Sequence, residues 1–248
     1  LGANRRNFYA DCLANKLDTD EFWQSRMPDH SKIKTPMLST ANWGGQGLHP
    51  RGNFEGFVRS ASNQKWLEVH GIEHWTHFYT DYGIDLQKRF FGHFLKGEDT
   101  GWLQSQPKVQ LQIRYPGEVF VERHENEWPL ARTDWTKYYI HPDTMTISTE
   151  KQVTESSAEY GGFSDGLTFL SDPLEADLEI TGPLASKLWV SSETNDADLF
   201  LVLRAFSPDM KEVTFQGALD PHTPLAQGWL RCSHRKLDKD LTLPYRPY

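Results

Sequence analysis

The sequence predicts an α/β unit followed by an all-β unit. Before about residue 100, helical and strand patterns alternate along the chain. Beyond that point, short runs rich in Val, Ile, Leu and Tyr recur between clusters of Gly, Pro, Asp and Ser, with little helical periodicity. A chain of 248 residues is long enough for one or two domains. We therefore place the boundary between residues 97 and 107 and expect units of residues 1–100 and 101–248.

Two short strands of the first unit have the pattern of a parallel sheet. Residues 34–42 and 66–70 each run into a Gly-rich turn, and a helical stretch at residues 48–60 separates them. That helix has Pro50 near its first turn, and Phe54, Phe57 and Val58 have the spacing of a buried face. A second amphipathic helix spans residues 84–95 and is expected to end at Gly97.

Two weaker helical patterns, at residues 7–17 and 20–27, precede the strands. Two parallel strands do not make a complete doubly wound sheet. The sequence therefore predicts a fragment whose remaining strands lie in another part of the protein.

The second unit is expected to be a jelly-roll-like sandwich. Strands are predicted at residues 109–115, 137–141, 167–170, 176–181, 186–191, 199–206 and 229–235. The most apolar of these, residues 186–191 and 199–206, should face each other in the core. Because sandwiches of this kind also bind carbohydrate, Trp128, Trp135 and Trp229 are alternative sugar-stacking residues if they form one exposed platform.

Composition argues against several classes of partner. The net charge of −8, without long blocks of like charge, predicts no nucleic-acid binding. No apolar run reaches the roughly 20 residues of a membrane span, and the first residues lack the apolar core of a signal peptide, so we expect no membrane association. Only two cysteines occur, without C-x-x-C spacing, which favours a reducing, cytoplasmic compartment. Phosphate-binding glycine loops and the H-E-x-x-H pattern are missing, so no cofactor and no metal are predicted.

Three segments of the first unit resemble one enzyme family. They read NWGGQGLHPRGNFEGF (residues 42–57), KWLEVHG (65–71) and DLQKRFFGHFLKG (85–97). They are similar to the last third of the catalytic domain of CocE/NonD hydrolases, which are serine acyl esterases related to X-Pro dipeptidyl-peptidases. In the second unit, ITGPLASKLWVSS (180–192), DADLF (196–200) and RCSHR (231–235) resemble the C-terminal, galactose-binding-like β-sandwich of the same family.

The resemblance implies a serine hydrolase that cleaves ester or amide acyl bonds in the intact protein. Its partners would be a small-molecule or peptide acyl substrate and the missing N-terminal part of the same protein, which would hold the nucleophile. This fragment alone is then expected to be inactive, and a homo-oligomer is compatible with the sequence. The alternative is a non-catalytic binding or scaffold module.

His74 is the predicted catalytic histidine. It follows the strand that ends at His70, where parallel sheets place their chemistry, and the corresponding loop of the family holds the catalytic histidine. His70 and His77 are alternatives, and strand alternation puts His70 on one face with Glu68. Trp75 would form an apolar wall of the cleft.

The acid of the triad is missing from its expected place. Relatives have an Asp two residues after the Trp that ends the earlier strand, whereas this chain has Gly45 after Trp43. Glu73 and Asp81, the acids nearest His74 in sequence, are candidate replacements. Alternatively, Asn42 or Gln46 hydrogen-bonds the histidine, within a tight turn around Gly44 and Gly45. Asn42, Trp43, Gly45, Gln46 and Trp75 are the predicted pocket residues.

One G-x-S-x-G sequence, centred on Ser164, is interpreted as a coincidence. A nucleophile elbow requires a parallel strand before the serine and a helix after it. Ser164 instead follows a polar stretch, precedes the strand-like residues 167–170, and comes after His74, in the wrong order for this class.

Overall fold

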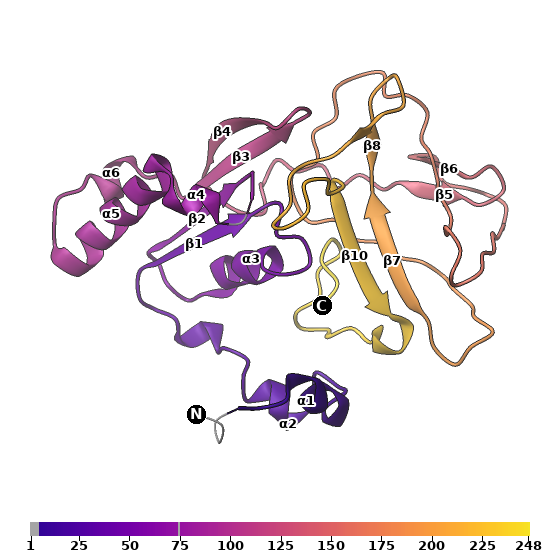
Figure 1. The fold of residues 1–248 in the computed structure, drawn as a ribbon, viewed down its shortest axis with the longest axis horizontal. Helices are drawn as coiled ribbons and strands as arrows, with labels where there is room; N and C mark the ends of the chain where they lie inside the picture. Colours follow the sequence, from indigo (N-terminus) through magenta and orange to yellow (C-terminus); the bar gives the residue numbers. More distant parts are fainter. Residues whose placement is uncertain (1–4, 74) are drawn as a thin grey trace.

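The computed structural model describes residues 5–73 and 75–248. Two short helices, α1 (Phe8–Ala14) and α2 (Glu21–Gln24), lie near the N-terminus. A mainly parallel sheet with its helices follows, and the C-terminal half forms a separate group of small sheets (Figure 1).

Four strands form the largest sheet, in the order β1-β2-β3-β4. They are β1 (Met37–Asn42), β2 (Lys65–His70), β3 (Val109–Tyr115) and β4 (Val119–Glu125). The first three are parallel, and β4 returns as an antiparallel hairpin partner of β3. The sequence placed the strand at residues 109–115 in the second unit. In the structure this strand is β3, and it extends the first sheet because Leu67 of β2 pairs with Val109.

Helices cover both faces of this sheet. On one face, α3 (Pro50–Arg59) packs against a core that includes Leu67, Val69 and Leu111, all 1% exposed or less. On the other, α5 (Asp81–Lys96) and α6 (Trp102–Ser105) enclose Trp66 (Figure 1). Alternation along β2 therefore sends Leu67 and Val69 to one core and Trp66 to the other.

The two amphipathic helices predicted around the second strand of the first unit are confirmed. Pro50 occupies the first turn of α3 and Phe57 is buried, although Val58 is 36% exposed, contrary to its prediction. Helix α5 begins after Thr80, whose hydroxyl accepts a hydrogen bond from Gly83 N, and ends at Gly97 in the left-handed conformation at φ 70°. Among the helices of the described residues, none has the length and apolar character needed to cross a bilayer.

The C-terminal half contains three two-stranded antiparallel sheets. Their strands are β5 (Tyr139–His141), β6 (Thr146–Ser148), β7 (Asp198–Leu203), β8 (Ala205–Phe206), β9 (Glu212–Val213) and β10 (Ala226–Arg231). The predictions for residues 199–206 and 229–235 are partly confirmed by β7, β8 and β10.

Three other strand predictions in this half are wrong. Residues 176–181 and 186–191 are irregular, and Trp189 is 85% exposed, so residues 186–191 are not a core strand facing residues 199–206. Residues 167–170 contribute only an isolated bridge between Leu170 and Thr146. An apolar, β-branched run becomes a strand only when a neighbouring strand accepts its hydrogen bonds, and none of the described residues pairs with these segments in that way.

The three tryptophans proposed to stack on sugar rings do not share a platform. Trp128 is buried in the core beside Phe54, with ring centroids 4.7 Å apart. Trp135 stacks on Tyr245 at 3.9 Å, and Trp229 lies on β10 against Gly47. Their separate positions give no support to the carbohydrate-binding alternative.

We expect Leu67→Ala to lower the free energy of unfolding by about 2–5 kcal/mol, because the truncation leaves a cavity between β2 and its neighbours. Urea unfolding measures this change. Leu95→Ala on the exposed face of α5 is the control and should stay within about 0.5 kcal/mol of the unaltered chain. Equal losses for the two variants would contradict the described core.

Candidate active site

The carboxyl ends of β1 and β2 meet at a cavity of about 680 Å³. Asn42 and His70, the last residues of the two strands, are register partners, and both line this cavity. Other parts of its wall come from Ser39, Thr40, Trp75, Phe78 and Tyr79. Parallel sheets bind ligands at this edge, so the cavity is the candidate site that the fold favours.

The loop that leaves β2 is fixed from two neighbouring strands. The Asn42 side-chain amide donates to the carbonyl oxygens of Gly71 and Ile72, each at 2.9 Å. Gly71 N donates to the Gln112 side chain at 3.0 Å, and the Phe120 ring fills the space where a Cβ on residue 71 would lie. Ile72 has φ 50°, a strained conformation for a β-branched residue, which indicates that its surroundings determine the loop's path.

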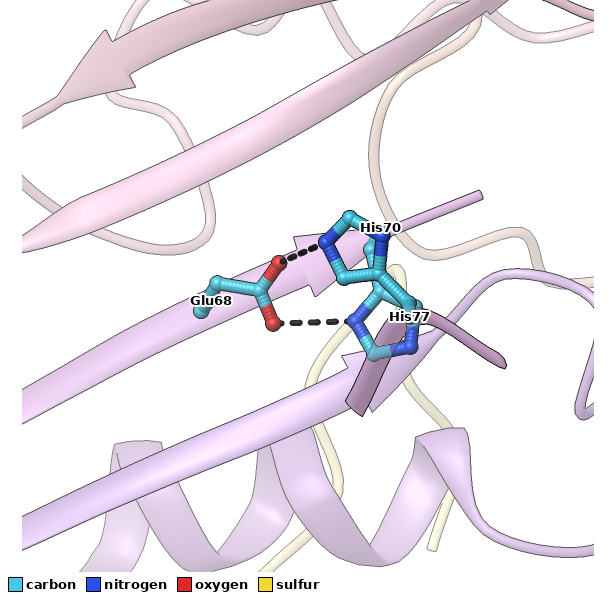
Figure 2. A group of neighbouring side chains, drawn as sticks. All are labelled: Glu68, His70 and His77. Carbon is cyan, nitrogen blue, oxygen red and sulfur yellow. Dashed lines mark hydrogen bonds and ion pairs between the residues drawn. The ribbon is translucent and has the colours of Figure 1, made fainter. Parts of the chain in front are cut away.

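A buried cluster lies beside this loop and consists of Glu68, His70 and His77. Figure 2 shows the Glu68 carboxylate facing both imidazoles. Its Oε2 lies 2.9 Å from Nδ1 of His70, and its Oε1 lies 3.8 Å from Nε2 of His77. The two rings stack with centroids 4.4 Å apart and an interplanar angle of 18°.

Hydrogen bonds extend the cluster toward β3 and β4. The Tyr82 hydroxyl donates to Glu68 Oε1 at 3.3 Å, and Gln110 Nε2 donates to the Tyr82 oxygen at 2.7 Å and to Glu122 at 2.9 Å. An ionised carboxylate only accepts hydrogen bonds, so His70 donates from Nδ1 to Glu68 and its Nε2 is the other ring nitrogen. That Nε2 has no hydrogen-bond partner among the described residues.

Burial determines which groups of the cluster are charged. It lowers the pKa of His77 to about 4, with a further contribution from the neighbouring His70, so His77 is neutral at pH 7. Burial also raises the pKa of Tyr82, and the nearby Glu68 carboxylate adds to this effect. Tyr82 therefore keeps the proton that it donates to Glu68.

The donor set of the cluster is one that could hold a metal ion, but its geometry does not suit one. One ligand atom from each of Glu68, His70 and His77 lies within 4.8 Å of the others. A metal ion binds an imidazole nitrogen in the plane of the ring, and two nearly parallel rings 4.4 Å apart cannot both point at a single ion. The arrangement is a hydrogen-bonded acid–histidine network.

The candidates for the acid lie at different places around the site. Glu73 accepts a hydrogen bond from Gln216 Nε2 at 3.4 Å, and Asp81 is exposed at the first turn of α5. The carboxylate that contacts histidines is Glu68. His74, the predicted catalytic histidine, lies outside the described residues, so its relation to these acids stays a prediction.

The predicted pocket residues divide into two groups. Asn42 and Trp75 line the cavity, and Trp75 is 61% exposed. Trp43 points into the core, where its Nε1 donates to Gln112 O at 2.8 Å. Gln46 donates to the carbonyl oxygens of Pro224 and Leu225, so those bonds tie the turn to the second half of the chain.

The glycines of this tight turn differ in their backbone conformation. Gly44 and Gly45 do not have positive φ values, whereas Gly47 does, at 74°. A Cβ on residue 44 would lie 2.6 Å from Gln216 O, and one on residue 45 would lie 3.3 Å from the Pro50 ring. Close packing against the Gln216 carbonyl thus excludes a side chain at residue 44, whereas a Cβ on residue 45 would make a tight contact with the Pro50 ring.

Ser164 lies in an exposed turn, where its hydroxyl donates to Gly161 O at 2.7 Å. Residues 149–169, all described, contain neither a strand before it nor a helix after it. The structure around Ser164 therefore lacks the parts of a nucleophile elbow, as the sequence predicted.

Sequence reasoning did not identify Glu68 as part of the site, although a signal was present. Glu68 is 1% exposed within a strand that is otherwise apolar toward its centre. A charged residue in a buried parallel strand requires partners, and the alternation that placed it beside His70 identified one of them. Its contacts with His77 and Tyr82 involve a turn and a helix whose packing the sequence does not specify.

Comparison with known proteins identifies the family. Residues 100–247 match the X-Pro dipeptidyl-peptidase C-terminal non-catalytic domain. The chain is also 26% identical, over 267 aligned positions, to cocaine esterase from Rhodococcus sp. (strain MB1 Bresler), covering 82% of this chain and 44% of that protein.

Two crystal structures of a CocE/NonD family hydrolase from Staphylococcus aureus have the same fold. They superpose with TM-scores of 0.93 and 0.89 at 32% and 29% sequence identity, and each comparison covers 98% of this chain. The chain spans 44% of the length of these relatives. It belongs to the CocE/NonD family and corresponds to the C-terminal portion of its members, which confirms the resemblance stated from the sequence.

The low pKa of His77 predicts a specific pH dependence of stability. The unfolded chain takes up a proton on this histidine near pH 6.5, but the folded chain does so only near its pKa of about 4, so stability present above pH 6.5 is lost as the pH falls. His77 alone should contribute a loss of about 2 kcal/mol between pH 7 and pH 5.

Urea unfolding at the two pH values tests this expectation on the unaltered chain and on His77→Gln. Between pH 7 and pH 5, the free energy of unfolding of the variant should fall by about 2 kcal/mol less than that of the unaltered chain. His222→Gln, in an exposed loop, is the matched control and should behave like the unaltered chain. If His77→Gln keeps the full pH dependence, the assigned protonation state is wrong.

Proposed function

We propose that this chain is the C-terminal portion of a serine hydrolase that cleaves ester or amide acyl bonds. Its first part would complete the α/β-hydrolase domain of the intact protein, and its second part would be the jelly-roll, galactose-binding-like domain. The substrate class is an acyl compound, either a small molecule or a peptide.

One observation carries this proposal. The carboxyl ends of two parallel strands, β1 and β2, open into one cavity, with Asn42 and His70 side by side in register. This is the edge at which α/β-hydrolases place the loops for the acid and the histidine of their triad. The relatives bearing the names cocaine esterase and CocE/NonD family hydrolase support the same class.

In this proposal His74 is the general base that takes a proton from a serine hydroxyl and returns it to the leaving group. The nucleophile and the oxyanion donors are supplied by residues outside this chain, and the reaction proceeds through an acyl-serine. Gly45 stands where relatives have an acid, which motivates the alternative of a non-catalytic binding or scaffold protein.

The intact protein should react with a fluorophosphonate probe, which labels activated serines. In that protein His74→Ala should lower kcat by about 10³-fold or more, because the serine then has no base. His124→Ala, an exposed histidine on β4, is the control and should leave kcat unchanged. No labelling, or an unchanged rate in His74→Ala, would favour the non-catalytic alternative.

The 248-residue chain alone should not hydrolyse nitrophenyl acetate above the background of a histidine peptide. A lone imidazole lacks a positioned nucleophile and an oxyanion hole, and Ser164 has no base in its exposed turn. Parallel assays of the chain and of Ser164→Ala measure this. Turnover that Ser164→Ala abolishes would show that the nucleophile lies in this chain.

A further inference from the structure

Both ends of the loop between β2 and α5 lie beside one carboxylate, and the first of them is hydrogen-bonded to it. His70 is the last residue of β2, and His77 belongs to α4 (Thr76–Tyr79), the short helix before α5. Glu68 hydrogen-bonds the first and lies 3.8 Å from the second. The residues that border this loop, His70 before it and His77 after it, therefore both lie beside the Glu68 side chain (Figure 2).

The attachment is buried and leaves little freedom of movement. Glu68 is 1% exposed, His70 7% and His77 8%. The imidazoles stack on each other, and the Tyr82 ring packs on His77 with centroids 4.6 Å apart. Since Tyr82 also donates to Glu68, the first turn of α5 is bound to the same carboxylate.

The backbone of Gly71 and Ile72 is hydrogen-bonded to side chains of the sheet. The Asn42 side chain donates to the carbonyl oxygens of Gly71 and Ile72, and the Gln112 side chain accepts from the amide of Gly71. Ile72 adopts a strained left-handed conformation that these contacts and the fixed loop ends must impose. A loop with strained backbone relaxes when an end is released, so the cluster at its ends determines its shape.

We propose that Glu68, through His70 and His77, is a positioning residue that fixes the loop of residues 71–76 for catalysis. This inference rests on the proposed function, since His74 falls within that loop. It assigns Glu68 a role apart from the triad acid, because its carboxylate contacts the histidines that border the loop. A hydrolase needs its base placed to well within 1 Å, and a buried clamp at both loop ends meets that need.

Three variants of the intact protein distinguish the effect of the Glu68 hydrogen bonds from the effect of its charge. Glu68→Leu removes every hydrogen bond of the clamp. Glu68→Gln keeps one oxygen that accepts from His70 Nδ1, replaces the oxygen that faces Tyr82 and His77 by an amide that only donates, and carries no charge. Glu122→Gln is the matched control, because Glu122 lies at the far end of the network, bonded to Gln110 and His124.

The kinetic readout is kcat per active site, with active sites counted by fluorophosphonate titration. Glu68→Leu should lower kcat per titrated site by about 10- to 100-fold, with KM changed less than about threefold. Glu68→Gln should recover part of this loss, because it keeps the bond to His70, and Glu122→Gln should match the unaltered protein. A residue needed only for stability would reduce the number of titrated sites but leave kcat per site unchanged.

The loop itself supplies a second readout. Amide hydrogen exchange of residues 71–76 should accelerate at least about tenfold in Glu68→Leu and remain slow in Glu122→Gln. His77→Leu should have a similar effect. The double variant should be little worse than either single one, because both remove the same clamp.

Three results would overturn the proposal. The first is an unchanged kcat per site together with unchanged exchange in Glu68→Leu. The second is additive effects of Glu68→Leu and His77→Leu. The third is a stoichiometric divalent ion in the purified protein that Glu68→Leu removes, because the cluster would then be a metal site. Failure of the proposed function appears separately, as full activity in His74→Ala.

Discussion

The parallel pairing of β1 with β2 is the constraint on which the site depends. The register that places Leu38 opposite Trp66 also places Asn42 opposite His70, four residues further along each strand. Because the period of side-chain direction in a strand is two, a shift of one residue would turn Asn42 and His70 to opposite faces. It would also turn Leu67 and Val69 out of their core. The apolar core thus fixes the position of the polar edge.

The second constraint is the cost of burying Glu68. An ionised carboxylate without partners inside a protein costs several kcal/mol, and it is tolerated only where hydrogen bonds satisfy its oxygens. Here His70 and Tyr82 supply those bonds. One face of β2 is consequently apolar at Trp66, under α5 and α6, and polar at Glu68 and His70, under α4. The same helix layer stabilises the sheet at one end and shapes the site at the other.

The parts of the fold that the sequence predicted are those with local signals. Strand β1, helix α3, strand β2 and helix α5 each follow from periodicity and from Pro50 or Gly97 at their ends. The place of β3 in the first sheet does not follow from such local signals, because its pairing with β2 joins segments about 40 residues apart. The failure at residues 186–191 has the same origin, because strand propensity does not supply a partner. For the candidate site, the sequence predicted the sheet edge at which the cavity lies and two residues that line it, Asn42 and Trp75. The partners of Glu68 depend on how α4 and α5 pack.

The C-terminal half also determines the shape of the site's edge. Its residue Gln216 donates to Glu73 in the loop after β2, and the carbonyl of the same residue packs against Gly44 in the turn after β1. Ala218 N donates to Gly44 O at 3.0 Å, and Gln46 reaches the carbonyls of Pro224 and Leu225. Both loops that border the cavity are therefore in contact with residues of the matched C-terminal domain. A domain described as non-catalytic in its family thus contributes to the geometry of this edge, because the turn after β1 leaves no room for a side chain at Gly44, where that domain packs.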